Sequence, residues 1–252
     1  MDALRQLISP IGFGAFKIGR NEGIKYEESY DLPDDATAER LLNGVLDLGV
    51  TYVDTAPAYG LSEERIGRFL SHRRAEFVLS TKVGERYENG ESTYDFSGHG
   101  IRESMEQSLR RLRTDTLDIV YLHAPRNDLA VINDSDAVST LLALRERGLV
   151  RAVGFSGHTT AAFRQAMDWA DALMLEYHSD DCSLESVIRE AAMLGKMIVV
   201  KKGLASGRIA GDQAIRFALA NRGVTSLVIG SLSLQHMAEN VGIAQSMRGE
   251  ET

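Results

Sequence analysis

Residues 52–60 read Tyr-Val-Asp-Thr-Ala-Pro-Ala-Tyr-Gly, and the other segments of the chain can be arranged around this stretch. It begins as a short strand pattern at residues 51–53, and it then presents Asp54, a turn at Pro57 and the phenol of Tyr59. A carboxylate at a strand end and a phenol five residues later suit proton transfer. A phenol has a pKa of about 10, so it becomes a useful acid when a nearby cation lowers that pKa.

The next two strand-like runs also end on residues that carry charge or protons. Residues 77–81 are followed by Lys82, and residues 118–122 are followed by His123. Lysine is the usual cation beside a catalytic phenol. In a parallel barrel the carboxyl ends of the strands meet at one face, where barrel enzymes have their active sites. The spacing therefore predicts that Asp54, Lys82 and His123 lie together.

Short β-branched runs alternate with amphipathic segments along the whole chain. We expect strands at residues 11–16, 51–53, 77–82, 118–123, 151–156, 172–176, 197–201 and 226–229. We expect helices at residues 36–48, 62–70, 101–112, 135–147, from 160, 183–194, 213–220 and from 233. Ser62 is the expected N-cap of the second helix, Trp169 lies in the fifth, and residues 84–99 read as a loop. About eight β/α units predict an α/β fold, a (β/α)8 TIM barrel, and the lack of linkers predicts a single domain over residues 1–252.

The composition is that of an ordinary globular protein. Of 252 residues, 44% are hydrophobic and 25% charged. The net charge of −8 argues against a nucleic-acid surface. The single cysteine, Cys182, rules out an internal disulfide and fits a reducing compartment. Since there is no signal-like N-terminus and no apolar run of about 20 residues, we expect a cytoplasmic protein that does not enter a membrane.

The chain resembles the aldo-keto reductase superfamily over roughly residues 8–241, and five segments carry the resemblance. Residues 54–60 are similar to that family's Asp-x-Ala-x-x-Tyr-Gly segment, residues 80–82 to its Ser-Thr-Lys strand end, and His123 to its strand-four histidine. Residues 148–156 resemble the entry into its fifth strand, and residues 230–240 resemble its final phosphate-binding turn. The resemblance implies an NAD(P)H-dependent reductase of a small carbonyl compound, or the corresponding alcohol dehydrogenase.

The resemblance also implies a role for each catalytic candidate. Tyr59 is the general acid that protonates the carbonyl oxygen, and Lys82 lowers its pKa by stabilising the tyrosinate. Asp54 pairs with Lys82 and orients it, whereas His123 hydrogen-bonds the substrate oxygen. The hydride has to come from a nicotinamide cofactor, because no side chain supplies one.

By the same resemblance, two further groups of residues line the cofactor and substrate sites. The expected cofactor contacts are Gly14, Ala15, Ser156, Met174, Lys201, Leu204, Gly230, Ser231, Ser233, His236, Glu239 and Asn240. The expected substrate pocket is Phe16, His123 and Pro125.

The chain departs from the family pattern where the nicotinamide is held. The family uses Ser, Asn and Gln for the nicotinamide amide, and here Ser156 is followed by Gly157, with Met174 at the third position. The seventh strand ends on Lys201 and Lys202 instead of the usual stacking aromatic. These lysines are either rim and solvated residues or a contact to a cofactor or substrate phosphate. Short loops after the seventh strand and at the tail leave the substrate undetermined.

The sequence favours one nicotinamide cofactor, NADP(H) or NAD(H), over the other only slightly. No Lys or Arg lies between residues 230 and 240, where the family grips a 2′-phosphate, although Arg208 could reach across. We expect NADP(H) to be slightly favoured on the family's habit, with NAD(H) as the alternative.

Two other functions remain open. One is a Schiff-base aldolase or lyase on the same barrel, with Lys201 or Lys82 as nucleophile. The other is a non-enzymatic nicotinamide-binding regulatory protein. One loop contains His178, Asp180, Asp181 and Cys182, but the chain has no paired-histidine motif elsewhere, so we expect no metal site. The oligomeric state and the direction of the reaction are not determined by the sequence.

Overall fold

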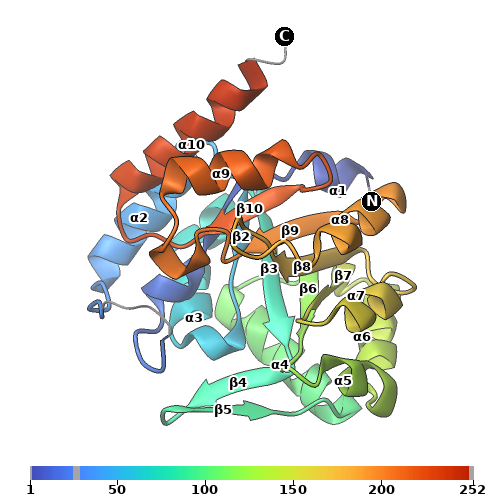
Figure 1. Cartoon of the computed structure of the whole chain (residues 1–252). Helices are drawn as coiled ribbons and strands as arrows, with labels where there is room; N and C mark the ends of the chain where they lie inside the picture. The colour runs from blue at the N-terminus through green and yellow to red at the C-terminus, as the bar shows by residue number, and fades with distance from the viewer. Residues whose placement is uncertain (1, 25–28, 250–252) are drawn as a thin grey trace.

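Eight parallel strands close into a barrel in the computed structural model of the chain, which describes residues 2–24 and 29–249 (Figure 1). Strand β10 pairs with β1 and closes the sheet, so the expected (β/α)8 TIM barrel is confirmed. In chain order the barrel strands are β1 (Ile11–Gly14), β2 (Tyr52–Asp54), β3 (Val78–Val83), β6 (Leu117–His123), β7 (Val150–Ser156), β8 (Ala172–Glu176), β9 (Met197–Lys201) and β10 (Ser226–Ile229).

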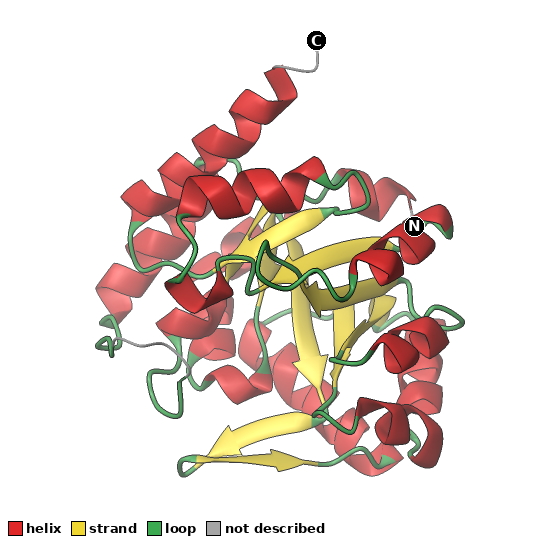
Figure 2. Ribbon diagram, in the orientation of Figure 1, coloured by secondary structure: helices red, strands yellow, loops and turns green. Residues whose placement is uncertain are grey.

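Helices surround the barrel and cover the outer face of its strands (Figure 2). The covering helices are α2 (Asp35–Asp47), α3 (Ser62–Leu70), α4 (Gly98–Leu112), α6 (Ala137–Glu146), α7 (Thr160–Ala166), α8 (Glu185–Met193), α9 (Gly211–Ala220) and α10 (Leu234–Gly249). Helix α2 illustrates the sequence logic, because Leu41, Leu42 and Val45 recur at helical spacing and are buried. Within the described ranges, no helix combines the length and apolar content needed to cross a membrane.

Several short elements were not expected from the sequence, and the first strand ends at Gly14 because residues 15 and 16, expected in it, begin a 3-10 turn. The unexpected elements are α1 (Asp2–Gln6), α5 (Asp128–Asp134), η1 (Ala15–Ile18), η2 (Pro57–Tyr59), η3 (Ser71–Glu76) and η4 (Ala205–Gly207). The expected loop at residues 84–99 instead contains an antiparallel hairpin of β4 (Glu85–Glu88) and β5 (Glu91–Tyr94). Its turn is Asn89-Gly90, with φ of 52° and 86°, which is a known hairpin signal.

Two local expectations were wrong. Ser62 is the first residue of α3 and not its N-cap, since Leu61 occupies that position. The Ser62 hydroxyl is buried and donates to the Ala15 carbonyl oxygen at 2.8 Å, which ties α3 to the end of β1. Trp169 lies beyond the end of α7, where its ring packs edge-on against Phe155.

Two tyrosines are among the buried side chains inside the barrel, below the strand ends. The Tyr52 and Tyr121 hydroxyl oxygens are 3.1 Å apart, and both side chains are fully buried. Gly12 and Gly154 make room for them, because a Cβ at Gly154 would lie 2.4 Å from Tyr121 Cδ1. Side chains two residues apart on a strand point to the same face. Asp54 therefore follows Tyr52 into the barrel, one layer nearer the carboxyl ends.

Candidate active site

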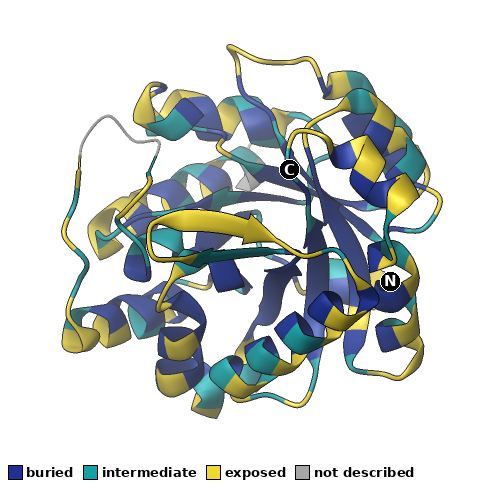
Figure 3. Cartoon of the chain, turned by 90° about the horizontal axis from the view of Figure 1, so that it is seen from below, coloured by how far each residue is buried: buried dark blue, intermediate teal, exposed yellow. Residues whose placement is uncertain are grey.

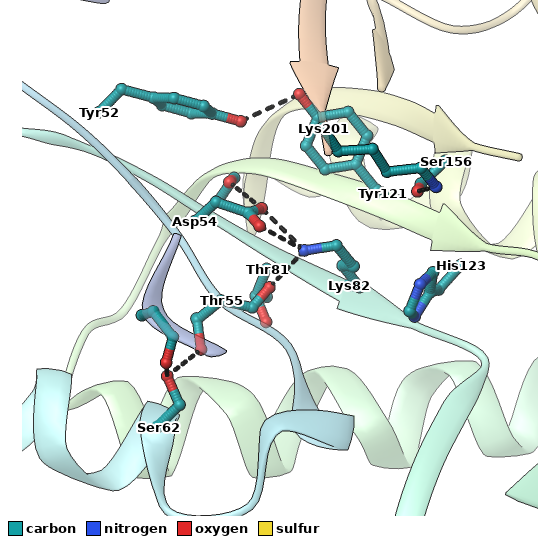
Figure 4. Close-up of polar contacts among 12 residues, drawn as sticks. Tyr52, Asp54, Thr55, Ser62, Thr81, Lys82, Tyr121, His123, Ser156 and Lys201 are labelled. Carbon is teal, nitrogen blue, oxygen red and sulfur yellow. Dashed lines mark hydrogen bonds and ion pairs between the residues drawn. The ribbon is translucent and has the colours of Figure 1, made fainter. Parts of the chain in front are cut away.

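A buried ion pair forms the centre of the site. Lys82 Nζ donates to Asp54 Oδ1 at 2.8 Å, to Asp54 Oδ2 at 2.7 Å and to the Thr55 carbonyl oxygen at 2.8 Å (Figure 4). Ser80 also donates to Asp54, at 2.7 Å. Burial alone would lower the pKa of Lys82, but Asp54 and Tyr59 raise it above its ordinary value. The side chain is therefore a fixed cation at neutral pH.

Tyr59 lies against this cation. It ends η2, directly after Pro57 has turned the chain, and its side chain is half-buried. Lys82 Nζ is 4.8 Å from the centre of the Tyr59 ring. On another side the ring of Phe16 meets it edge-on, with centroids 5.0 Å apart. The structure thus brings together Asp54, Lys82, Tyr59 and the expected pocket residue Phe16.

Opposing effects of burial and of neighbouring charges set the pKa of Tyr59. Burial raises the pKa of the phenol, Lys82 lowers it, and Asp54 raises it again, so that the sum lies above the ordinary value. Lys82 therefore lowers the pKa of Tyr59 as expected, but desolvation outweighs the cation, so the net pKa is raised. At neutral pH Tyr59 therefore keeps its proton.

His123 completes the set from the end of β6, and it has a partner that the sequence analysis missed. Its Nδ1 lies 2.8 Å from Glu85 Oε2, at the start of the hairpin. Burial lowers the pKa of His123, Glu85 raises it, and Lys82 and Lys201 lower it again, with a net lowering. The one available signal was position, since Glu85 follows the end of β3 and so lies at the active-site face.

Lys201 also points into the site. At the end of β9 its Nζ donates to Ser156 Oγ, at the end of β7, at 2.9 Å. Burial, followed by the charges of Lys202 and Lys82, lowers the pKa of Lys201 to about 7. Lys202 is instead exposed on the rim and is paired with Glu176 at 2.8 Å.

The loop after β9 has an unusual backbone. Lys202, Ala205 and Ser206 have φ of 53°, 48° and 62°, which is the left-handed region that non-glycine residues rarely adopt. Such conformations cost about 1–3 kcal/mol each and gather at binding sites. Leu204, an expected cofactor contact, lies within this loop and is partly buried.

The turn before α10 contains most of the other expected cofactor residues. Ser231 Oγ accepts from the Ser233 N–H at 3.1 Å, and Ser233 Oγ accepts from the His236 N–H at 3.2 Å. The serine hydroxyls therefore build the turn and cap the helix. The first-turn N–H groups of a helix have no carbonyl partner within the helix itself.

The other expected positions differ in accessibility. Gly14 ends β1 and pairs with Asp54, and Ala15 is buried directly after it. Met174 is 1% exposed and packs inside the barrel, so it contributes to the core. Near α10, Gly230 precedes the turn, Glu239 is exposed and Asn240 is buried. Pro125, an expected pocket residue, is half-buried after β6.

Known proteins match the chain over most of its length. Residues 10–213 match the Aldo/keto reductase family. A D-threo-aldose 1-dehydrogenase from a Pseudomonas species is 35% identical over 188 residues, which cover 65% of this chain and 54% of that protein. The chain thus spans about half the length of this relative. L-galactose dehydrogenase from Arabidopsis thaliana is 26% identical, covering 93% of this chain and 83% of the relative.

A solved structure agrees with the barrel and its helices. The crystal structure of a candidate aldo-keto reductase from Pseudomonas aeruginosa has a TM-score of 0.88 and 38% identity, covering 95% of this chain and 92% of that one. Together with the family match over residues 10–213, this likeness shows that the chain belongs to the aldo/keto reductase family.

Proposed function

We propose that the protein is an NAD(P)H-dependent oxidoreductase that interconverts the carbonyl and alcohol forms of a small molecule. The observation that carries the proposal is the buried Lys82–Asp54 pair, which lies beneath the half-buried phenol of Tyr59. A nicotinamide cofactor, when bound, supplies or accepts the hydride.

Each residue has a separate part in moving the proton. Tyr59 donates its proton to the carbonyl oxygen, and burial ensures that the proton is present at neutral pH. Lys82, whose ammonium lies 4.8 Å from the ring centre, stabilises the tyrosinate that forms. Asp54 and the Thr55 carbonyl oxygen hold Lys82 in place. A positioned acid of this kind accelerates a reaction by about 10²- to 10⁴-fold.

The residues present fit a dinucleotide at both of its ends. The first turn of α10 offers backbone N–H groups to a phosphate. At the other end, Ser156 keeps the family's serine hydroxyl for the nicotinamide amide, and the Lys201 amine lies beside it on the strand where the family has a stacking aromatic. Since no Lys or Arg lies between residues 230 and 240, the 2′-phosphate of NADP(H) finds no cationic partner in this turn and adds little to the binding energy. We therefore favour NADP(H) slightly, with NAD(H) close behind.

Relatives with sugar substrates in their names suggest where to look for the substrate. Besides the aldose and galactose dehydrogenases, they include a D-arabinose 1-dehydrogenase from Saccharomyces cerevisiae, 29% identical over 189 residues. Aldoses therefore belong in the substrate panel beside simple aldehydes and ketones.

Deuterium transfer tests the proposal. The protein is incubated with NADPH or NADH deuterated at C4 of the nicotinamide and with each carbonyl compound, and the products are analysed by mass spectrometry. We expect deuterium at the former carbonyl carbon of at least one product. Failure to transfer deuterium to any compound would contradict the proposal. Tight cofactor binding without transfer would instead support a nicotinamide-binding regulatory protein.

One observation favours a second candidate, a Schiff-base aldolase or lyase. The pKa of Lys201, lowered to about 7 by burial, Lys202 and Lys82, leaves part of its amine neutral and nucleophilic at neutral pH. Borohydride reduction in the presence of an aldehyde, followed by peptide mass spectrometry, tests this candidate. An adduct on Lys201, absent in Lys201→Met, would support it, and an unmodified Lys201 would exclude it.

A further inference from the structure

A cavity lined by arginines lies on the outer wall of the barrel, between α3 and the C-terminal end of α4. Its volume is about 490 Å³, which is within the range of small-molecule sites. The five arginines that line it are Arg65, Arg68, Arg110, Arg111 and Arg113. Figure 3 shows that the barrel strands are buried and that the surrounding helices carry exposed residues on their outer sides. Arg68 and Arg113 are among these exposed residues, so the cavity opens to solvent.

Close packing of the two helices brings the arginines together. A Cβ at Gly67 of α3 would collide with the Arg111 carbonyl oxygen, so the glycine allows the backbones of α3 and α4 to approach each other. Arg65 and Arg68 are three residues apart and share one face of α3. The last turn and the C-cap of α4 supply the other three arginines. Two separate helices thus direct cations into one cavity.

The two arginines of α3 have partners within the protein. Arg65 Nη2 is 3.1 Å from Asp35 Oδ1, and Arg65 Nη1 donates to the Ile18 carbonyl oxygen at 2.6 Å. Arg68 Nη1 donates to Asp35 Oδ2 at 2.6 Å. One carboxylate therefore serves two guanidinium groups, and positive charge is left over on this side of the cavity.

The three arginines of α4 are not satisfied in this way. Arg111 lies 3.5 Å from Glu63 Oε2 and 3.9 Å from Glu64 Oε1, whereas a charge-assisted hydrogen bond measures about 2.7–2.9 Å. Arg110 and Arg113 are exposed, and within residues 2–24 and 29–249 their side chains have no hydrogen bond or ion pair. Their guanidinium groups are therefore available to a ligand.

The cavity is strongly positive although the protein is acidic. Among the described residues that line it, only Asp35 and Glu64 are acidic, so the five arginines leave a net charge of +3. The whole chain has a net charge of −8. The negative end of the α4 helix dipole favours cations in its last turn, but it does not account for two more arginines on α3. Like charges gathered in this way repel each other, and an anion between them relieves the repulsion.

We infer that this cavity binds a small anion with two or more phosphate groups, which Arg110, Arg111 and Arg113 hold by charge-assisted hydrogen bonds. A planar guanidinium group matches two phosphate oxygens at once, and every cation among the described lining residues is an arginine. The inference does not depend on the proposed activity. Because α4 ends just before β6 begins, its last turn lies towards the amino ends of the strands, away from Tyr59.

Isothermal titration calorimetry with inorganic triphosphate tests the inference. The wild type is compared with the double variant Arg110→Gln and Arg113→Gln at physiological salt, where diffuse surface attraction is screened. We expect the wild type to bind and the Kd of the variant to rise about tenfold or more, because charge-assisted contacts are lost. The control is Arg102→Gln with Arg147→Gln, which removes the same charge and should keep the wild-type Kd. Arg102 is exposed on α4 and Arg147 is the exposed C-cap of α6, and neither lines the cavity.

Further titrations identify the ligand class and the place of binding. Inorganic phosphate should bind more weakly than triphosphate, since it carries fewer charges. Saturating NADPH should leave the triphosphate Kd unchanged, because the proposed cofactor site lies at the carboxyl ends of the strands. Equal weakening in both double variants, displacement by NADPH, or no binding of triphosphate would overturn the inference. Binding to vesicles that contain phosphatidylinositol bisphosphate, without binding of triphosphate, would also overturn it. Since these titrations need no turnover, their failure is distinguishable from a failure of the proposed activity.

Discussion

Lys82 donates hydrogen bonds to both oxygens of Asp54 and to the Thr55 carbonyl oxygen. Lys82→Met should therefore affect both activity and stability. It removes the cation that stabilises the tyrosinate, and it leaves the Asp54 carboxylate buried without its partner, which costs about 3–5 kcal/mol. Steady-state kinetics and a thermal melt of the same preparation measure the two effects.

Asp54→Asn is the matched comparison and should be milder. The amide oxygen and the Thr55 carbonyl oxygen still accept from Lys82, so the cation stays while its orientation loosens. We expect a smaller loss of kcat than in Lys82→Met. If Asp54→Asn lost more activity, Asp54 would have a direct part in the chemistry and the hierarchy proposed here would be wrong.

Glu63 provides a prediction about pH and stability. It is fully buried in α3 and accepts from Thr81 Oγ1 at 2.7 Å. Burial raises its pKa, although Thr81, Ser108 and Arg111 lower it in part. A carboxyl with a raised folded-state pKa binds protons more tightly when folded, so its contribution to stability falls as pH rises through the ordinary value of 4.5 towards the raised value.

Glu63→Gln should therefore stabilise the protein at neutral pH, on the order of 1 kcal/mol. The advantage over the wild type should shrink as the pH is lowered towards the ordinary carboxyl range, where Glu63 is protonated in both states. Thermal melts across that range measure the difference. A lower Tm than the wild type at neutral pH would show that the ion pair with Arg111 outweighs the burial of the charge.

At the scale of elements, packing between β7 and β6 depends on the absence of a side chain at Gly154. A Cβ there would lie 2.4 Å from Tyr121 Cδ1 and 3.0 Å from the Ala172 carbonyl oxygen. Gly154→Ala should therefore cost about 1–3 kcal/mol of stability by overpacking. Gly242→Ala is the control, since a Cβ at this position in α10 meets nothing within 4 Å. The control should gain up to about 1 kcal/mol from helix propensity, and equal denaturant midpoints for both variants would contradict the packing argument.

The barrel could be predicted because its strands have a recognisable sequence pattern. Strands such as β6 and β9 are apolar runs covered on both faces, and their polar ends at His123 and Lys201 mark the active-site edge. The hairpin could not be found in this way. Its strand β5 is exposed throughout, so it has no buried face and no alternation of apolar residues.

The chemistry of the site was only partly predictable for a related reason. The sequence shows that Lys82 and Tyr59 are present. Whether the pKa of Tyr59 is raised or lowered, however, depends on how far the fold buries the phenol. Similarly, the contact between Glu85 and His123 requires the hairpin to fold back over the barrel. Serine is a common N-cap residue, but in the folded chain the Ser62 hydroxyl donates to the Ala15 carbonyl oxygen instead of capping the helix.

For the whole molecule, the composition of the turn before α10 predicts a modest preference for NADPH over NADH. The chain has a net charge of −8, and no Lys or Arg lies between residues 230 and 240. Without a charge-assisted partner for the 2′-phosphate, the preference for NADPH over NADH should stay below about a hundredfold, or about 2.7 kcal/mol. Fluorescence titration with both cofactors at neutral and mildly alkaline pH measures the ratio. A larger preference that persists in Arg208→Ala would contradict the prediction.

The central claim, that Tyr59 is the proton donor, is tested most directly by Tyr59→Phe. The ring still fills the space beside Phe16 and Lys82, so the fold and cofactor binding should be unchanged. The measurement is kcat for carbonyl reduction, taken beside the cofactor Kd of the same variant. The proposed mechanism predicts a fall in kcat of about 10²-fold or more with an unaltered Kd. A variant that retains the wild-type kcat would contradict it.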